Sequence, residues 1–540
     1  MDKKSTTGYI QFTDNDQINL LVNRLVQIGA ALSAERNLER LFEMIVDEAR
    51  NFTNADGGTL YIMSDDETEL QFAIIQNSTL NVRMGGTGGK ITWHPVKLKN
   101  PDGSPNYANV SAYAALSDEV VNIPDVYDAE GFNFGGTRKF DAGTGYRSKS
   151  MLVVPMRNHE DDIIGVLQLL NSRDTLTGEV ITFSLESQKI TESLASQAAI
   201  ALSNSRLILD LEELLESFIK AIATAIDEKS PYTGGHVRRV AELTMVIAKK
   251  INETKEGPYA HIYFNEDELR ELRIAAWLHD VGKVTTPEYV VDKATKLETI
   301  FDRIEILKAR FEIMKKEHEV ALMKQGIAYQ ETQGSENLPS SNNDYVKTLE
   351  EYLRFLVNAN DGSEFMPKEM IEKVKNIAQE QIVMNGKKQP LLTDNEVYNL
   401  SIQRGTLNDE EREIINNHAV VTRKMLAQLP FPKKLRSVPD FAGAHHERLD
   451  GTGYPLGLKG DQLPLQARII ALTDVFEALT AKDRPYKKGK TLSEAMKIMS
   501  FMVKDNHIDS DLFNLFVKEC VYLDYAQREL SPQQIDIIES

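Results

Sequence analysis

The chain has 540 residues, which exceeds the size of one hydrophobic core and indicates about three to four domains. Its formal net charge of -19 argues against nucleic acid or an anionic membrane as the main partner, because both favour a basic protein surface. The single cysteine, Cys520, excludes an intramolecular disulfide framework and favours a reducing compartment.

The N-terminal segment, residues 1–34, is expected to hold a helix ahead of the first domain. Apolar residues at helical spacing predict two amphipathic helices between residues 15 and 50. The N-terminus lacks the apolar segment of a signal peptide, and no apolar run approaches the roughly 18 residues that span a bilayer. We therefore expect a soluble, cytoplasmic protein with no membrane contact.

Residues 35–205 have the pattern of a small α/β domain. A first hairpin is predicted from β-rich runs at 58–63 and 70–75, and a second from runs at 151–156 and 163–170. Helix, strands, long loop, hairpin and helix in this order indicate an antiparallel sheet with helices packed on it.

Three stretches of this domain resemble GAF domains of the cyclic-nucleotide-phosphodiesterase type. They are Val121–Asp125, Thr144–Leu152 and Gly165–Asn171. Ligand-binding members of that type carry Asn-Lys and then Phe-x-x-x-Asp-Glu, whereas this chain has Asn171-Ser172 and, after Phe183, Ser187-Gln188. The resemblance implies a sensor, either with a pocket for an unknown small ligand or as a structural dimerisation module.

A continuous connecting helix is predicted for residues 187–227, which contain no proline or glycine. Residues recur there at heptad spacing, at Leu194, Ala201, Ile208, Leu215 and Ile222. The partner positions of this seam are Gln197, Asn204, Leu211, Phe218 and Ala225. This pattern favours a coiled coil that joins two chains as a parallel homodimer. The alternative is a long helix packed on its own domain.

Five of the ten histidines lie at core-facing helix positions or in the stretch Ala444–Pro455. With two aspartates they form the set His236, His279, Asp280, His418, His445, His446 and Asp474. Each histidine alone could be a hydrogen-bonded core residue, but a core-facing carboxylate is costly unless it is paired or ligating. A shared cation site in a helical bundle satisfies all seven side chains together.

In this order, the seven residues resemble the HD-GYP family of the HD phosphohydrolase superfamily. The resemblance includes the motifs His279–Lys283 and His445–Pro455, and it places an all-α domain at 228–297 and 404–505. It implies a metal-dependent phosphodiesterase that hydrolyses cyclic di-GMP to linear pGpG, with GMP as a further product to be tested. The GAF domain would then regulate the enzyme.

The resemblance also assigns the metal ligands. Asp280 bridges two divalent ions, of which one is also held by His236, His279 and Asp474, and the other by His418, His445 and His446. The resemblance favours iron, and the donor set also accepts manganese or zinc. Some members hold a third ion with a glutamate, but this chain has Tyr232 there, so two ions are expected.

Asp280 and Lys283 are the expected catalytic residues, because a lysine beside the bridging carboxylate could neutralise a phosphate oxygen. Arg484 and Lys487 resemble a second phosphate clamp, with a solvated loop as the alternative. The glycine-rich loop after His446 contains Asp450, Gly451, Gly453, Tyr454 and Pro455. We expect its glycines to permit a tight loop, and Tyr454-Pro455 to form a partner-docking surface rather than a catalytic one.

Residues 298–403 interrupt the HD-GYP pattern and are expected to form a helical insertion, with helices at 301–324, 348–357 and 368–383 and a mobile tip at 334–343. The insertion could cover the site, contact the sensor or a second chain, or be neutral. Residues 506–540 are expected to form a helical tail.

Two further functions stay open at this point. The domain could hydrolyse another phosphate ester, such as the mixed GMP-AMP cyclic dinucleotide or a nucleotide alarmone. The chain could also be a non-catalytic signalling scaffold that docks partners through the insertion and the glycine-rich loop.

Overall fold

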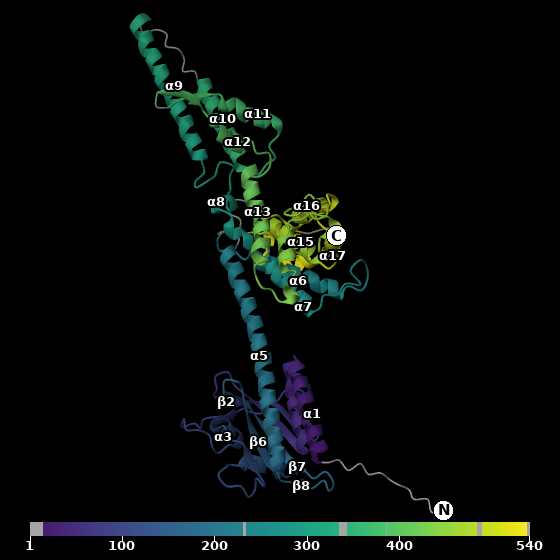
Figure 1. The fold of residues 1–540 in the computed structure, drawn as a ribbon. Helices are drawn as coiled ribbons and strands as arrows, with labels where there is room; N and C mark the ends of the chain where they lie inside the picture. Colours follow the sequence, from purple (N-terminus) through teal and green to yellow (C-terminus); the bar gives the residue numbers. More distant parts are fainter. Residues whose placement is uncertain (1–13, 230–233, 334–342, 385, 483–488, 537–540) are drawn as a thin grey trace, which may run out of the picture. The chain divides into compact units, whose positions relative to one another are not determined.

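The structure is a computed structural model that describes residues 14–229, 234–333, 343–384, 386–482 and 489–536 (Figure 1). The chain divides into two compact units, Met1–Leu214 and Leu215–Ser540. Within the described residues, no helix combines the length and the apolar character needed to cross a membrane.

The first unit begins with two helices, α1 (Asp14–Ala34) and α2 (Leu38–Thr53), as predicted. Asn37 caps α2, because its side chain accepts a hydrogen bond from the N–H of Arg40. One face of α2, which includes Leu41 and Ile45, is buried against the sheet.

The sheet of the first unit is antiparallel throughout, in the order β3-β2-β1-β7-β6-β5, with β4 beside β2 and β8 beside β7. The strands are β1 (Ala55–Met63), β2 (Glu69–Asn77), β3 (Val82–Gly85), β4 (Val96–Lys97), β5 (Val121–Ile123), β6 (Met151–Arg157), β7 (Ile163–Arg173) and β8 (Val180–Ile181). Both predicted hairpins are present, as β1–β2 and β6–β7. Short helices η1 (Gly86–Gly88), α3 (Val110–Ser117) and α4 (Gly135–Thr144) lie in the connections.

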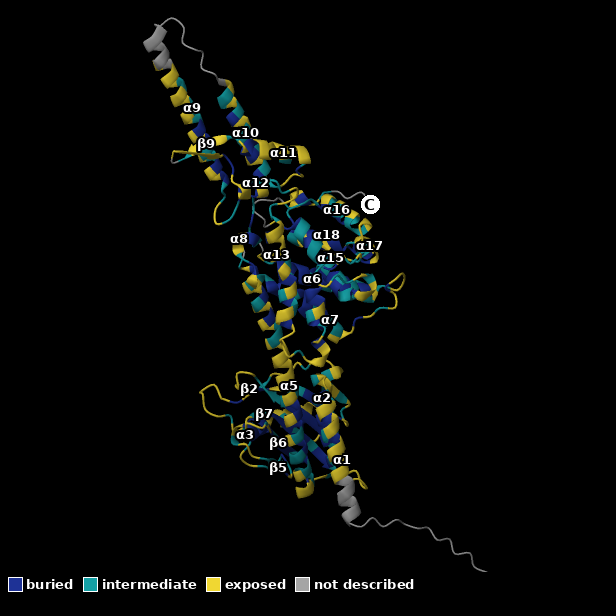
Figure 2. Cartoon of the chain, turned by 45° about the horizontal axis from the view of Figure 1, so that its top comes forward, coloured by how far each residue is buried: buried dark blue, intermediate teal, exposed yellow. Residues whose placement is uncertain are grey.

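Alternate residues of these strands belong to separate cores on the two faces of the sheet. Leu60 and Leu152 pack with residues of α1, α2 and the following long helix. Their neighbours Tyr61 and Val153 pack with α3 on the other face. Figure 2 shows the buried strands in dark blue.

The long helix α5 (Leu185–Asp227) confirms the continuous helix predicted from the sequence. Four of the five heptad positions named above serve the chain's own cores, whereas Ile208 is 59% exposed. Leu194 and Ala201 are buried in the core of the first unit, and Leu215 and Ile222 pack against that of the second. A stripe of α5 is exposed, made of Ile200, Asn204, Leu207, Leu211, Leu214 and Phe218. It includes Asn204, Leu211 and Phe218, which are partner positions of the predicted seam.

The second unit contains a helical domain built from two stretches of sequence. The first stretch forms α6 (His236–Glu253), α7 (Glu266–Leu278), η2 (Val281–Thr285) and α8 (Glu288–Val291). The second forms α13 (Asp409–Leu426), η3 (Lys433–Leu435), α14 (Val438–Gly443), η4 (Gly460–Gln462), α15 (Leu465–Thr480), α16 (Leu492–Lys504), α17 (Ser510–Lys518), α18 (Val521–Glu529) and η5 (Pro532–Gln534). One large core joins the two stretches.

The expected C-terminal tail is helical, and it belongs to this core. Phe516 of α17 and Tyr525 of α18 lie against Phe476 of α15, with ring centroids 4.9 and 5.5 Å from that of Phe476. The domain therefore extends past the expected boundary at residue 505.

The insertion has a hydrophobic core of its own. It comprises α9 (Ile304–Gln333), α10 (Asn343–Asp361), α11 (Lys368–Ala378), β9 (Gln381–Met384), β10 (Lys387–Pro390) and α12 (Asp394–Leu400). The helix expected at 368–383 was wrong beyond residue 378, because the β-branched pair Ile382-Val383 and the turn residue Gly386, with φ of +72°, favour the hairpin β9–β10. Of the expected tip at 334–343, residues 334–342 lie outside the described residues, and Asn343 begins α10.

Candidate metal centre

All seven predicted ligands converge in the second unit, from five separate places in the chain. His236 begins α6, His279 and Asp280 follow α7, and His418 lies in α13. His445 and His446 follow α14, and Asp474 lies in α15. Helix packing thus brings together side chains that are far apart in the sequence.

Asp280 lies between two groups of imidazoles. Its Oδ2 is 3.4 Å from Nε2 of both His236 and His279. Its Oδ1 is 3.3 Å from Nε2 of His418 and 3.9 Å from Nε2 of His445. Each carboxylate oxygen therefore faces a different group, as the bridging role requires.

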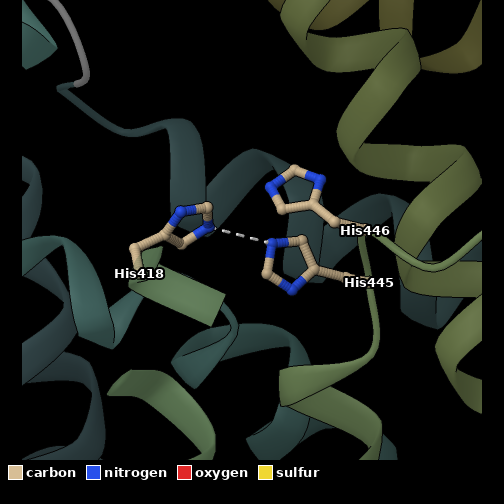
Figure 3. A group of neighbouring side chains, drawn as sticks. All are labelled: His418, His445 and His446. Carbon is tan, nitrogen blue, oxygen red and sulfur yellow. Dashed lines mark hydrogen bonds between the residues drawn. The ribbon is translucent and has the colours of Figure 1, made fainter. Parts of the chain in front are cut away.

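Asp474 completes the first group, and His446 completes the second. Oδ1 of Asp474 is 3.3 Å from Nε2 of His236 and 4.0 Å from Nε2 of His279. His418, His445 and His446 offer ligand atoms that all lie within 4.8 Å of one another (Figure 3).

Backbone carbonyls hold three of the rings by their other nitrogen. Nδ1 of His279 donates to the carbonyl of Ala276, at 2.8 Å, and the Nδ1 atoms of His418 and His445 donate likewise to carbonyls three residues earlier. This hydrogen bond fixes the tautomer and leaves the Nε2 lone pair of each ring directed at the centre.

His236 is held by Glu477, which the sequence analysis missed. Nδ1 of His236 contacts Oε2 of Glu477, and the guanidinium of Arg239 donates through Nε to Oε1 at 2.7 Å. Glu477 is completely buried. A carboxylate behind a ligating imidazole raises its basicity and fixes its orientation.

A close approach between η2 and α13 puts Asp280 beside His418. The N–H of Gly282 donates to Oγ1 of Thr422, at 2.9 Å, and this hydroxyl donates to the carbonyl of His279, at 3.0 Å. A Cβ on Gly282 would lie 2.0 Å from the carbonyl oxygen of His418, so only glycine fits there.

The electrostatics of the site follow from burial and from its mixture of charges. Burial, with neighbouring histidines, lowers the pKa of His446 to about 3 and that of His445 well below its usual value. Burial alone would raise the pKa of Asp280, but Lys283 and the histidines outweigh it and hold that pKa well below its usual value. His445 and His446 therefore offer neutral imidazoles, and the bridge offers a carboxylate.

The polar atoms at the centre fit divalent cations. Nε2 of His418 and Nε2 of His445 lie 3.4 Å apart, and neither carries a proton if both Nδ1 atoms donate to carbonyls. Nε2 of His279 and Oδ1 of Asp280 are buried and have no hydrogen-bond partner. A cation between such lone pairs would satisfy all of them.

A cavity of about 240 Å³ opens onto these residues, and Lys283, Tyr454 and Asp474 are part of its wall. Nζ of Lys283 lies 2.5 Å from Oδ2 of Asp280, which is consistent with its expected place beside the reacting phosphate. A neighbouring cavity of about 380 Å³ shares Tyr454 and adds Arg448 and Lys490. The expected clamp residues Arg484 and Lys487, and Tyr232, lie outside the described residues.

The glycine-rich loop is tight, as expected. A Cβ on Gly453 would lie 2.4 Å from the amide nitrogen of Arg448. Glu447 is buried and accepts hydrogen bonds from the N–H groups of Leu456 and Leu458, a role that the sequence analysis did not assign.

Tyr454 lies beside the candidate metal centre. Its ring is 4.8 Å from that of His446, between centroids, and it lines both cavities. The loop turns back over His446, and the expected partner-docking surface at Tyr454-Pro455 stays a prediction. Asp450 accepts hydrogen bonds within the loop from Thr452, and Pro455 lines a separate groove with residues of α13.

Comparison with known domain families agrees with this geometry. The GAF domain profile matches residues 37–202, and two HD domain profiles match residues 233–349 and 393–512. The chain carries a GAF domain followed by an HD domain. The two HD matches include all seven residues of the centre.

Curated relatives match this chain over part of its length. A 3'3'-cGAMP-specific phosphodiesterase of Vibrio cholerae is 44% identical over 114 residues, which cover 21% of this chain and 26% of the relative. A second such enzyme of V. cholerae is 43% identical over 96 residues, 18% of this chain and 20% of the relative. A cyclic di-GMP phosphodiesterase of Pseudomonas aeruginosa is 41% identical over 114 residues, 21% of this chain and 26% of the relative. The matches thus span about a quarter of each relative's length.

Proposed function

We propose that the HD domain is a metal-dependent phosphodiesterase that hydrolyses a cyclic dinucleotide. The observation that carries this proposal is the position of Asp280, whose two oxygens each face a different pair of imidazoles. A bridging carboxylate of this kind suits a pair of divalent ions.

His236, His279 and Asp474 would hold one ion, and His418, His445 and His446 the other, with Asp280 shared between them. Such an ion pair lowers the pKa of bound water and stabilises charge on phosphoryl oxygens during in-line attack. Lys283 would neutralise a non-bridging oxygen of the phosphodiester. The imidazole-rich donor set supports iron, with manganese or zinc as alternatives.

Cyclic di-GMP is the proposed substrate, with pGpG as the first product and GMP as a second. Relatives named for cyclic di-GMP and for 3'3'-cGAMP both match this chain, so the mixed cyclic dinucleotide is the main competing substrate.

Chromatography of nucleotides after incubation with protein loaded with iron, manganese or zinc tests this proposal. Linear pGpG should appear with wild-type protein and should be absent with Asp280→Ala. Equal amounts of cyclic di-GMP and 3'3'-cGAMP in one reaction would rank the two substrates. Unchanged nucleotides with every metal would refute hydrolysis and favour the scaffold.

We also propose that the protein acts as a parallel homodimer in the cytoplasm, regulated through the GAF domain. The exposed stripe on α5 alternates spacings of four and three residues between Ile200 and Phe218 in the coiled-coil manner. Leu207, Leu211 and Leu214 are 55, 67 and 65% exposed, so a second copy could cover them. Asn204 would lie at a core position, where a polar residue sets the register of two helices.

A further inference from the structure

The segment just after α5 contacts the turn that carries Lys283. The ammonium of Lys229 donates hydrogen bonds to the backbone carbonyls of Lys283, at 3.2 Å, and of Val284 and Thr286, both at 2.7 Å. These three carbonyls belong to η2 and the residue after it, immediately beyond Asp280.

The ammonium group of Lys229 suits this cluster of backbone carbonyls. Carbonyls at the end of a helix have lone pairs left over from the helix's own hydrogen bonds, and an ammonium group offers three donors for them. The carbonyl of Lys283 also accepts a hydrogen bond from the N–H of Thr286. The positive charge of the ammonium also favours the C-terminal end of the turn. Lys229 therefore contacts the backbone of the segment that contains Lys283.

A second contact ties the end of α5 to the other side of the centre. The buried carboxylate of Asp227 accepts a hydrogen bond from the N–H of Val237, at 3.2 Å. Val237 is the residue after the ligand His236, in the first turn of α6. The end of α5 is thus hydrogen-bonded to backbone on both sides of the centre.

We propose that Lys229 is a positioning residue that fixes η2, and with it Lys283, to the end of α5. A shift or rotation of this helix end would then change where the Lys283 ammonium lies relative to Asp280. The catalytic consequence rests on the proposed phosphodiesterase function, whereas the mechanical connection does not.

Hydrogen exchange in the full-length, metal-loaded protein tests the connection. Lys229→Met removes the donors and keeps much of the side-chain length, and Lys229→Arg keeps a cation with several donors. Lys220→Met changes an exposed lysine of the same helix and serves as the matched control. We expect peptides covering residues 281–286 to exchange about tenfold faster in Lys229→Met than in the wild type. In Lys229→Arg they should exchange near the wild-type rate, and in Lys220→Met at the wild-type rate.

Metal content should be the same in the wild type and in the three variants, because Lys229 contacts no ligand side chain. If the wild type hydrolyses cyclic di-GMP, Lys229→Met should lower kcat about tenfold and Lys229→Arg should restore most of it. Unchanged exchange at 281–286 in Lys229→Met, or equally faster exchange throughout α6 and α15, would overturn the proposal. Because exchange is measured without substrate, it tests the connection even if no hydrolysis is found.

Discussion

Gly282 lies against His418 so closely that a Cβ on Gly282 would be 2.0 Å from the carbonyl oxygen of His418. The same Cβ would be 2.6 Å from the amide nitrogen of Thr422. This contact between η2 and α13 places Asp280, which precedes η2, close to His418 of α13.

Gly282→Ala should therefore separate the two halves of the centre. We expect metal content, measured by mass spectrometry, to fall by about tenfold or more, because α13 must move away from η2. Gly136→Ala in α4 is the matched control, since a Cβ there meets nothing within 4 Å. Full metal content in Gly282→Ala would contradict the role given to this contact.

Glu477→Gln should lower the protein's affinity for one of the two ions more than for the other. Glutamine keeps the shape of the side chain but removes the charge behind the ring of His236, and loss of such a partner typically costs about 10- to 100-fold in metal affinity. Titration with metal should show one site weakened and the other retained. Glu242→Gln, which alters the partner of Arg238 on the same helix α6, should leave both sites unchanged.

Leu211→Glu should dissociate the proposed homodimer, because it places a charge in the middle of the exposed stripe on α5. Light scattering should report one chain per particle. Leu209→Glu is the control, since Leu209 is also about half exposed but lies outside the stripe. Equal effects of the two substitutions would argue against this face as the interface.

Lys296→Met should stabilise the insertion at neutral pH. The side chain is 1% exposed, and Nζ contacts Sδ of Met366 and the carbonyl of Leu400, both at 3.3 Å. Burial lowers the pKa of this amine to about 8 from 10.5, so the charged form costs on the order of 3 kcal/mol at pH 7.

The pH dependence of this effect has a defined sign. Between the folded and unfolded pKa values, about 8 and 10.5, the unfolded chain binds a proton that the folded chain has released, so stability rises with pH. Hydrogen exchange in α10 and α12 should be slower in Lys296→Met than in the wild type at pH 7, and the difference should shrink towards pH 10. A difference that grows with pH would contradict this account.

The ligands could be predicted from the sequence because each lies within a short motif or on an apolar helix face. Inward-facing polar residues such as His418 and Asp474 are rare enough that one shared explanation was sufficient. The long helix could be predicted because residues 187–227 lack proline and glycine.

The supporting residues could not be predicted in this way. Glu477 and Thr422 look like ordinary helix residues, and their roles depend on contacts with His236 and Gly282 from distant segments. The heptad pattern of α5 included Asn204, Leu211 and Phe218 of the exposed stripe, but heptad spacing does not say which apolar positions the chain buries in its own cores. Leu194 and Leu215 follow that spacing and serve such cores.

The anchoring of the imidazoles has a consequence for metal choice. Carbonyls of the helices and the carboxylate of Glu477 hold the rings, so the ligand cage is preorganised by the polypeptide before any ion enters. The fixed geometry and the donor types of this cage then set its relative affinity for each ion. The ion it acquires should then follow relative affinity and cellular supply, so that growth in iron-poor or manganese-rich medium would alter the metal recovered with the protein.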